Sequence, residues 1–135
     1  MVEMKIVYEG HLHCVLTHGP SGAVINTDAP KDNMGRGEAF SPTDLVAAAL
    51  GSCLLTVMGI QANRHQIDMQ GAHADVSKEM VTVPQRRIGK ITVIIHMPQG
   101  IPEDKRSMLE AAAHSCPVHQ SLHPDTDIKV QFIYA

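Results

Sequence analysis

Alternating apolar and polar positions near both ends of the chain predict β-strands, and a long apolar stretch between them predicts a helix. A period of two residues sends successive side chains to opposite faces of a strand. Six strands are expected, at residues 5–8, 11–17, 23–26, 71–80, 90–97 and 128–134. Turn residues bound the early strands, as in Gly19-Pro20-Ser21-Gly22, so the first three strands should be joined by short connections.

The long apolar stretch has a well-marked helix start. Ser41 is a favourable N-cap, Pro42 suits the first helical turn, and Asp44 stands where a capping-box acid would lie. The helix should continue to about Asn63 or His65. Residues 45–60 are apolar nearly all round, which predicts a buried central helix. A chain of this size cannot easily cover such a helix alone, so a homodimer is expected.

The remaining segments complete an α+β order. Residues 27–37 form a long loop rich in Gly, Pro, Asp and Asn, and residues 102–113 form a second, amphipathic helix. Pro117 at a first helical position would make Cys116 the N-cap of a short helix through Leu122. The expected fold is a single domain, residues 1–135, in the order β-β-β-α-β-β-α-β with a mainly antiparallel sheet.

Composition excludes several classes of partner and location. The chain has 135 residues, a formal net charge of -3, no Trp and two each of Phe and Tyr, which argues against nucleic-acid binding. The first residues lack the pattern of a signal peptide, so a cytoplasmic protein is expected. Residues 45–63 carry no charge, but their Ala and small polar residues favour a core helix over a membrane span.

Two of the three cysteines invite chemistry, and each has a plainer interpretation. Cys53 lies within the apolar helix, where a buried thiol often packs as a small hydrophobe. Cys116, near a helix N-terminus, has a setting that favours a thiolate. His114 and His119 flank it and make zinc a minor alternative, although no second pair of ligands has metal-site spacing. Cys14 has no chemical context and is expected to be structural.

A reactive Cys53 would need a cation outside its own helix. Arg36 is the best-placed candidate because its loop leads directly into the helix start, and a guanidinium keeps its charge when partly buried. A solvated loop residue is the alternative for Arg36. Phosphate-binding loops, dinucleotide-binding glycine patterns and the serine-hydrolase elbow are absent from the sequence, so neither a cofactor nor a metal is expected.

Three segments of the chain form a recognisable set: GEAFSPTDL at residues 37–45, AAALGSC at residues 47–53 and CPVH at residues 116–119. They resemble the OsmC/Ohr family of osmotically inducible and organic hydroperoxide resistance proteins. The resemblance covers nearly the whole chain and implies an OsmC-like intertwined homodimer with its active sites at the subunit interface. It also implies a thiol peroxidase that reduces organic hydroperoxides through a Cys53 sulfenate and a Cys53–Cys116 disulfide. A dithiol, such as a lipoyl group, would restore both thiols.

The resemblance also implies an arginine and a glutamate in the active site, and their positions in this sequence are less directly matched. The glutamate usually follows the proline at the helix start, where this chain has Thr43, and Asp44 is about 100° further around the helix. Arg36 is the candidate arginine and Glu38 the candidate carboxylate. The alternative function is a non-catalytic OsmC-like protein that binds a small apolar ligand.

Overall fold

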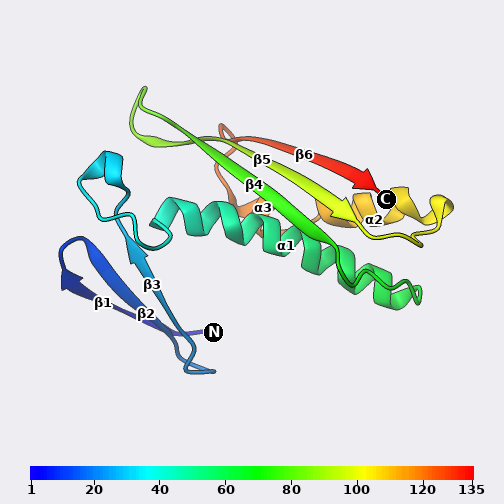
Figure 1. Ribbon diagram of the computed structural model, residues 1–135, viewed down its shortest axis with the longest axis horizontal. Coiled ribbons are helices and arrows are strands. Elements are labelled where there is room, and N and C mark those ends of the chain that lie inside the picture. Colours follow the sequence, from blue (N-terminus) through cyan, green and yellow to red (C-terminus); the bar gives the residue numbers. More distant parts are fainter. The chain divides into compact units, whose positions relative to one another are not determined.

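The computed structural model describes residues 1–135, which divide into two compact units, residues 1–46 and 47–135 (Figure 1). The boundary lies inside the long helix α1 (Pro42–Arg64). The first unit contains β1 (Met4–Gly10), β2 (His13–His18), β3 (Val24–Asp28) and the 3₁₀ turn η1 (Lys31–Asn33). After α1, the second unit contains β4 (His73–Val81), β5 (Arg87–Met97), η2 (Glu103–Lys105), α2 (Arg106–His114), α3 (Pro117–Ser121) and β6 (Asp127–Tyr134).

The first unit is a three-stranded antiparallel sheet in the order β1-β2-β3. Its register pairs Cys14 with both Tyr8 and Thr27, so Cys14 lies in the central strand. Few residues of the unit are buried: Thr27, Asp28 and Ser41. Large apolar side chains of its strands are exposed, notably Met4, Ile6, Tyr8, Val24 and Ile25. A sheet of this kind does not bury its own apolar surface.

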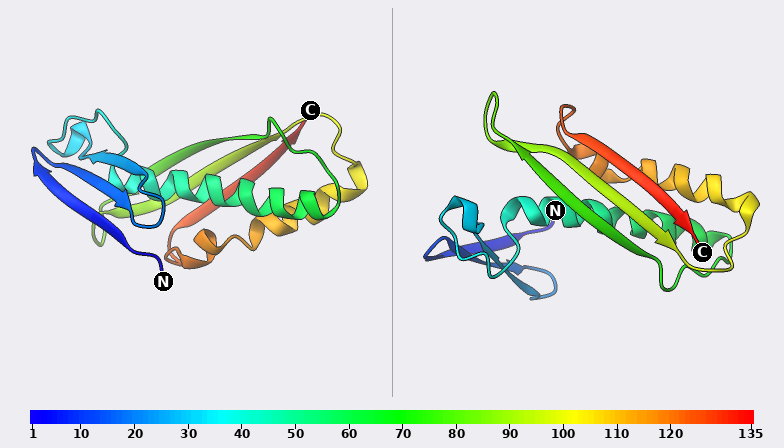
Figure 2. Two further views of the ribbon diagram at one scale, coloured as in Figure 1. Left: turned by 90° about the horizontal axis from the view of Figure 1, so that it is seen from below. Right: turned by 45° about the horizontal axis from the view of Figure 1, so that its top comes forward.

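The second unit contains the core of the protein. Its sheet has the order β4-β5-β6, with β4 and β5 antiparallel and β5 and β6 parallel. Every second residue of β5 from Ile91 to Met97 is buried, and α1 and α2 lie against that face of the sheet (Figure 2). The core consists mainly of Leu50, Leu54, Met58, Ile91, Val93, Ile95, Leu109 and Ala113.

The start of α1 is held by a complete capping box. The backbone N–H of Asp44 donates to the Ser41 hydroxyl over 3.1 Å, and the Asp44 carboxylate accepts the Ser41 N–H over 3.0 Å. Two backbone donors that would otherwise lack partners are thereby satisfied, as the sequence predicted. The carboxylate of Asp44 is therefore engaged in fixing where the helix begins.

The buried residues of α1 form one stripe rather than a complete surface. Leu50, Leu54, Met58 and Ala62 recur at helical spacing and are buried, whereas Ile60 remains 49% exposed. By length and mean hydropathy, α1 is a helix that could cross a membrane. Part of its apolar surface is buried in the protein itself, where the stripe packs on the sheet.

The α+β class, the element order and the predominance of antiparallel pairing are confirmed. Two details differ from the expectation. The strands form two three-stranded sheets instead of one, because β3 pairs only with β2 and the last strand pairs with β5. The second helix begins at Arg106, since residues 103–105 form a 3₁₀ turn after Pro102. A single domain stays a prediction.

Gly51 lets α1 approach β4 closely, and Gly59 in the same helix provides a matched control. A methyl group at Gly51 would lie 2.7 Å from a Val76 methyl carbon, whereas one at Gly59 would meet no atom within 4 Å. Gly59→Ala should raise the free energy of unfolding by about 0.5–1 kcal/mol. The free energy of unfolding of Gly51→Ala should be about 1–3 kcal/mol lower than that of Gly59→Ala, because the added methyl group overpacks the core. Urea unfolding measures both, and equal values would contradict the close approach.

Candidate active site

Cys53 and Cys116 lie together in the second unit although 63 positions separate them along the sequence (116 minus 53). Cys53 is half-buried on α1 and packs against the core, while Cys116 is fully buried between α2 and α3. The two thiols lie close enough for Cys53 to influence the pKa of Cys116, and both cysteines are free. The structure therefore places one accessible and one inaccessible thiol in direct contact.

Cys116 is the N-cap of α3, as the sequence predicted. Pro117 occupies the first helical turn, and the backbone N–H of His119 donates to the Cys116 sulfur over 3.5 Å. The N–H of a residue at the start of a helix has no acceptor within the helix. Proline, which lacks this N–H, therefore costs nothing there. The sulfur thus takes the place of the usual capping oxygen.

The pKa of the Cys116 thiol is raised, contrary to what its helix N-terminal position predicted. Burial is the largest cause, and the hydrogen bond with Cys53 adds to it. The backbone N–H groups of His119 and Val118 lower the pKa, but they do not offset the loss of solvation. Cys116 therefore stays protonated at neutral pH.

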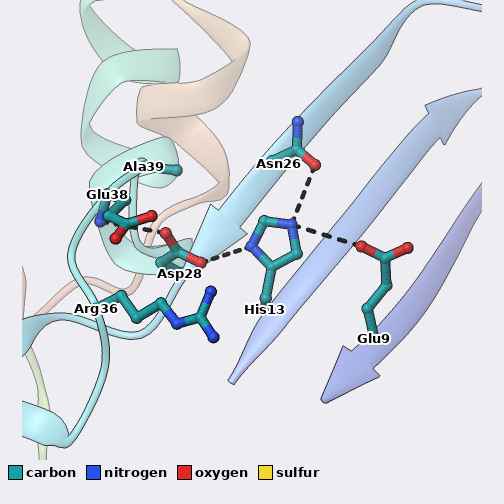
Figure 3. Close-up of a pocket in the computed structure, with 7 residues that line it drawn as sticks. All are labelled: Glu9, His13, Asn26, Asp28, Arg36, Glu38 and Ala39. Carbon is teal, nitrogen blue, oxygen red and sulfur yellow. Dashed lines mark hydrogen bonds and ion pairs between the residues drawn. The ribbon is translucent and has the colours of Figure 1, made fainter. Parts of the chain in front are cut away.

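A polar cavity of about 550 Å³ lies in the first unit and contains the predicted Arg36 and Glu38 (Figure 3). The other residues lining it are Glu9, His13, Asn26, Asp28 and Ala39. The side chains of Arg36 and Glu38 are exposed. Arg36 makes no hydrogen bond or ion pair within the chain, so its guanidinium donors are free to meet a ligand.

His13 and Asp28 form the central contact of this cavity and were not anticipated from the sequence. His13 Nδ1 lies 2.5 Å from the Asp28 carboxylate, and Nε2 lies 3.2 Å from the Asn26 side-chain oxygen. The pKa of His13 is raised, chiefly by the hydrogen bond with Asp28 and against a smaller effect of burial. The only sequence signal was the placement of both residues on neighbouring strands, where the β2–β3 register pairs them directly.

The predicted site residues thus fall into two groups. Cys53 and Cys116 are brought together in the second unit, and Arg36 and Glu38 share a cavity in the first. One active site made of all four residues stays a prediction. Thr43, at the position of the family glutamate, has its hydroxyl 3.3 Å from that of Ser41 at the helix start.

The structure gives the two histidines near Cys116 contacts of other kinds than a shared metal. The His114 ring packs edge-on against Phe132, with 6.1 Å between ring centres, and His119 contacts Cys116 through its backbone N–H. No group of three or more His, Cys, Asp or Glu side chains is arranged to hold a metal ion.

The difference in burial predicts which thiol reacts first. A limiting amount of iodoacetamide at neutral pH should modify Cys53 before Cys116, because Cys116 is both inaccessible and protonated. Peptide mass spectrometry after quenching measures the modification of each cysteine. In unfolded protein the two cysteines should be labelled at similar rates. Faster labelling of Cys116 than of Cys53 in the folded protein would contradict the assignment of Cys53 as the accessible thiol.

Comparisons with known proteins identify the family of this chain. The sequence model of a family described as OsmC-like protein matches residues 35–131. A Psychrobacter arcticus protein, described as an osmotic stress induced and detoxification response protein, has a solved structure that is 42% identical, with a TM-score of 0.92 and coverage of 98% of this chain and 96% of that one. No match was found among curated proteins.

More distant structures share the fold. An organic hydroperoxide resistance protein OsmC from Legionella pneumophila is 20% identical, with a TM-score of 0.74 and coverage of 98% of this chain and 96% of that one. The organic hydroperoxide resistance protein OhrB of Bacillus subtilis is 18% identical, with a TM-score of 0.67 and coverage of 98% and 97%. The family match and the 42% identical relative together show that this protein belongs to the OsmC family.

Proposed function

We propose that this protein is a thiol peroxidase that reduces organic hydroperoxides with Cys53 and Cys116. The observation that carries the proposal is the contact between an accessible and a buried thiol in one core. A structural role alone requires neither the contact nor the difference in burial. The organic hydroperoxide resistance proteins that share the fold support the same chemistry.

In the first step, Cys53 attacks as a thiolate. Its sulfur forms a bond to the terminal oxygen of the hydroperoxide, the O–O bond breaks, and the alkoxide takes a proton and leaves as an alcohol. Cys53 is then a sulfenic acid. Cys53 packs against the apolar core, a setting that suits an alkyl hydroperoxide better than hydrogen peroxide.

In the second step, Cys116 resolves the sulfenic acid. The Cys116 sulfur attacks the sulfur of Cys53, its proton leaves with the hydroxyl group as water, and a Cys53–Cys116 disulfide forms. The N–H groups of His119 and Val118 would stabilise the sulfur as its proton departs. An external dithiol of the lipoyl kind then exchanges twice with the disulfide, becomes oxidised itself and restores both thiols.

Arg36 and Glu38 are proposed to complete the site. Arg36 has free donors for a thiolate or a peroxide oxygen, as the first step requires. The carboxylate of Asp44 is held in the capping box, which leaves Glu38 as the candidate for the family glutamate. We further propose a cytoplasmic location, where free thiols persist at rest.

Single cysteine substitutions should separate the two steps. Cys53→Ser should abolish hydroperoxide consumption in the presence of a dithiol because the nucleophile is lost. Cys116→Ser should react once and stop at a sulfenic or sulfinic acid. Cys14→Ser, the matched control, should retain turnover. The assay follows consumption of cumene hydroperoxide with dihydrolipoamide.

The result also distinguishes the second class of function. A wild-type protein that consumes no organic hydroperoxide would favour a non-catalytic OsmC-like protein that binds a small apolar ligand. Full turnover by Cys53→Ser would show that the nucleophile is assigned to the wrong residue.

We also propose that the active form is a homodimer. The support is the exposed apolar surface on the first sheet, where Met4 is 63% and Ile6 57% exposed, and on α1 at Ile60. Soluble proteins seldom leave contiguous apolar patches of this kind uncovered. Each Å² covered by a second copy would contribute about 25 cal/mol.

Sedimentation should therefore detect a two-chain species near twice 14.6 kDa. Ile6→Lys should shift the distribution towards the single chain, because it places a charge on the exposed apolar face. Glu3→Lys, a charge change at an exposed polar position, should not. A wild-type protein that sediments as a stable single chain would contradict the proposal.

A further inference from the structure

Asp28 is a buried carboxylate that ties together three segments of the first unit. Only 3% of its surface is exposed. Its Oδ1 contacts His13 Nδ1 on β2, and its Oδ2 accepts the backbone N–H of Glu38 over 3.1 Å. Its own backbone N–H donates to the carbonyl oxygen of Phe40 over 3.1 Å. One residue at the end of β3 thus holds both a neighbouring strand and the segment of residues 36–40.

The segment of residues 36–40 is also folded tightly against the chain that follows β3. Gly35 N–H donates to the Pro30 carbonyl and Gly37 N–H to the Ala29 carbonyl. A side chain at Gly35 would lie 1.7 Å from the Ala29 oxygen, and Gly37 has φ +62°, so both positions require glycine. Arg36 stands between these two glycines, and its place depends on how the segment is held.

Hydrogen-bond acceptors surround both nitrogens of His13. Asp28 accepts at Nδ1, while the Asn26 oxygen at 3.2 Å and the Glu9 carboxylate at 3.7 Å face Nε2 (Figure 3). Only the imidazolium can donate from both nitrogens, so this environment selects the charged ring. Arg36 and Glu38 are the other charged groups lining the same cavity.

We propose that His13 and Asp28 are positioning residues that hold the segment of residues 36–40, and thereby set the places of Arg36 and Glu38. The consequence for catalysis rests on the proposed function, in which those two side chains serve the reaction at Cys53. Neither His13 nor Asp28 needs to touch the substrate. Their effect on the reaction passes through Arg36 and Glu38.

The proposal has a pH dependence of defined sign. The pKa of His13 is raised in the folded protein, so the charged contact with Asp28 is fully present below the ordinary pKa of histidine. The contact loses its charge as the pH rises through the raised pKa. The hold on the segment should therefore weaken on the alkaline side.

The first experiment follows the segment itself by ¹H–¹⁵N nuclear magnetic resonance of the wild-type protein. The Glu38 amide, which donates to Asp28, should shift with the same midpoint as the His13 ring. His13→Ala should remove that transition, and His11→Asn, a control at an exposed turn position, should leave it unchanged. A Glu38 amide that does not follow His13 would overturn the proposal.

The second experiment measures the rate of Cys53 oxidation by an organic hydroperoxide. His13→Ala should be about tenfold slower than wild type near pH 6, the loss expected for one hydrogen bond to a charged group. The ratio of the wild-type rate to the His13→Ala rate should fall as wild-type His13 loses its proton, because the contact with Asp28 then keeps its hydrogen bond but loses its charge. His13→Asn, which keeps a donor near the position of Nδ1, should recover part of the rate without the histidine-dependent change in ratio.

A double substitution separates positioning from general loss of stability. If His13 acts through Arg36, then His13→Ala in an Arg36→Ala background should cause little further slowing. Independent, additive losses would overturn the proposal. Asp28→Asn should behave like His13→Ala, with Asp32→Asn as the exposed control.

The two experiments also distinguish this proposal from the proposed function. A wild-type protein that does not react with hydroperoxide, yet shows linked titration of His13 and Glu38, would refute the peroxidase and leave the positioning role standing. An active wild type whose rate is unchanged in His13→Ala would refute the positioning role alone.

Discussion

The packing of α1 on the β4-β5-β6 sheet is the constraint on which the thiol pair depends. Leu50, Leu54 and Met58 fix the rotation of the helix because they must enter the core. Gly51 allows the close approach to Val76 that this packing requires. With the helix so fixed, Cys53 lies at the edge of the core beside Cys116. Neither cysteine could reach the other if the helix turned by one residue, about 100°.

The same packing makes the two thiols unequal. Cys116 is enclosed by the core that Leu109 and Ala113 of α2 help to form, and its pKa rises because burial outweighs two backbone donors. Cys53 remains partly accessible. A two-step mechanism uses this inequality, because the thiol that meets an external substrate should be accessible and the one that resolves it need not be. The difference in burial thus determines which of the two thiols reacts first, although their side chains are chemically identical.

Much of the fold could be predicted from local signals. The capping box at Ser41 and Asp44, the N-cap at Cys116 and the alternation within β5 depend on residues close together in sequence. The pKa of Cys116 could not be predicted in this way, because the local N–H groups argue for a lowered pKa and only distant packing reverses it. The local N–H groups do lower the pKa of Cys116, as the sequence suggests, but burial raises it by more.

The His13–Asp28 contact was missed for a related reason. The two residues are 15 positions apart and meet only through the register of β2 and β3, which no single motif specifies. Once the register is known, the contact between the buried Asp28 carboxylate and the His13 ring follows from it. Arg36 and Glu38 could be predicted from their place in the loop before the helix, and the structure shows that they line one cavity.

The most direct test of the account is the intact mass of the reduced wild-type protein after one equivalent of cumene hydroperoxide. The thiol pair should lose two hydrogens, and peptide mapping should locate the new disulfide between Cys53 and Cys116. An unchanged mass would contradict the central claim that the paired thiols react with a hydroperoxide. A stable gain of one oxygen would contradict the resolving role of Cys116.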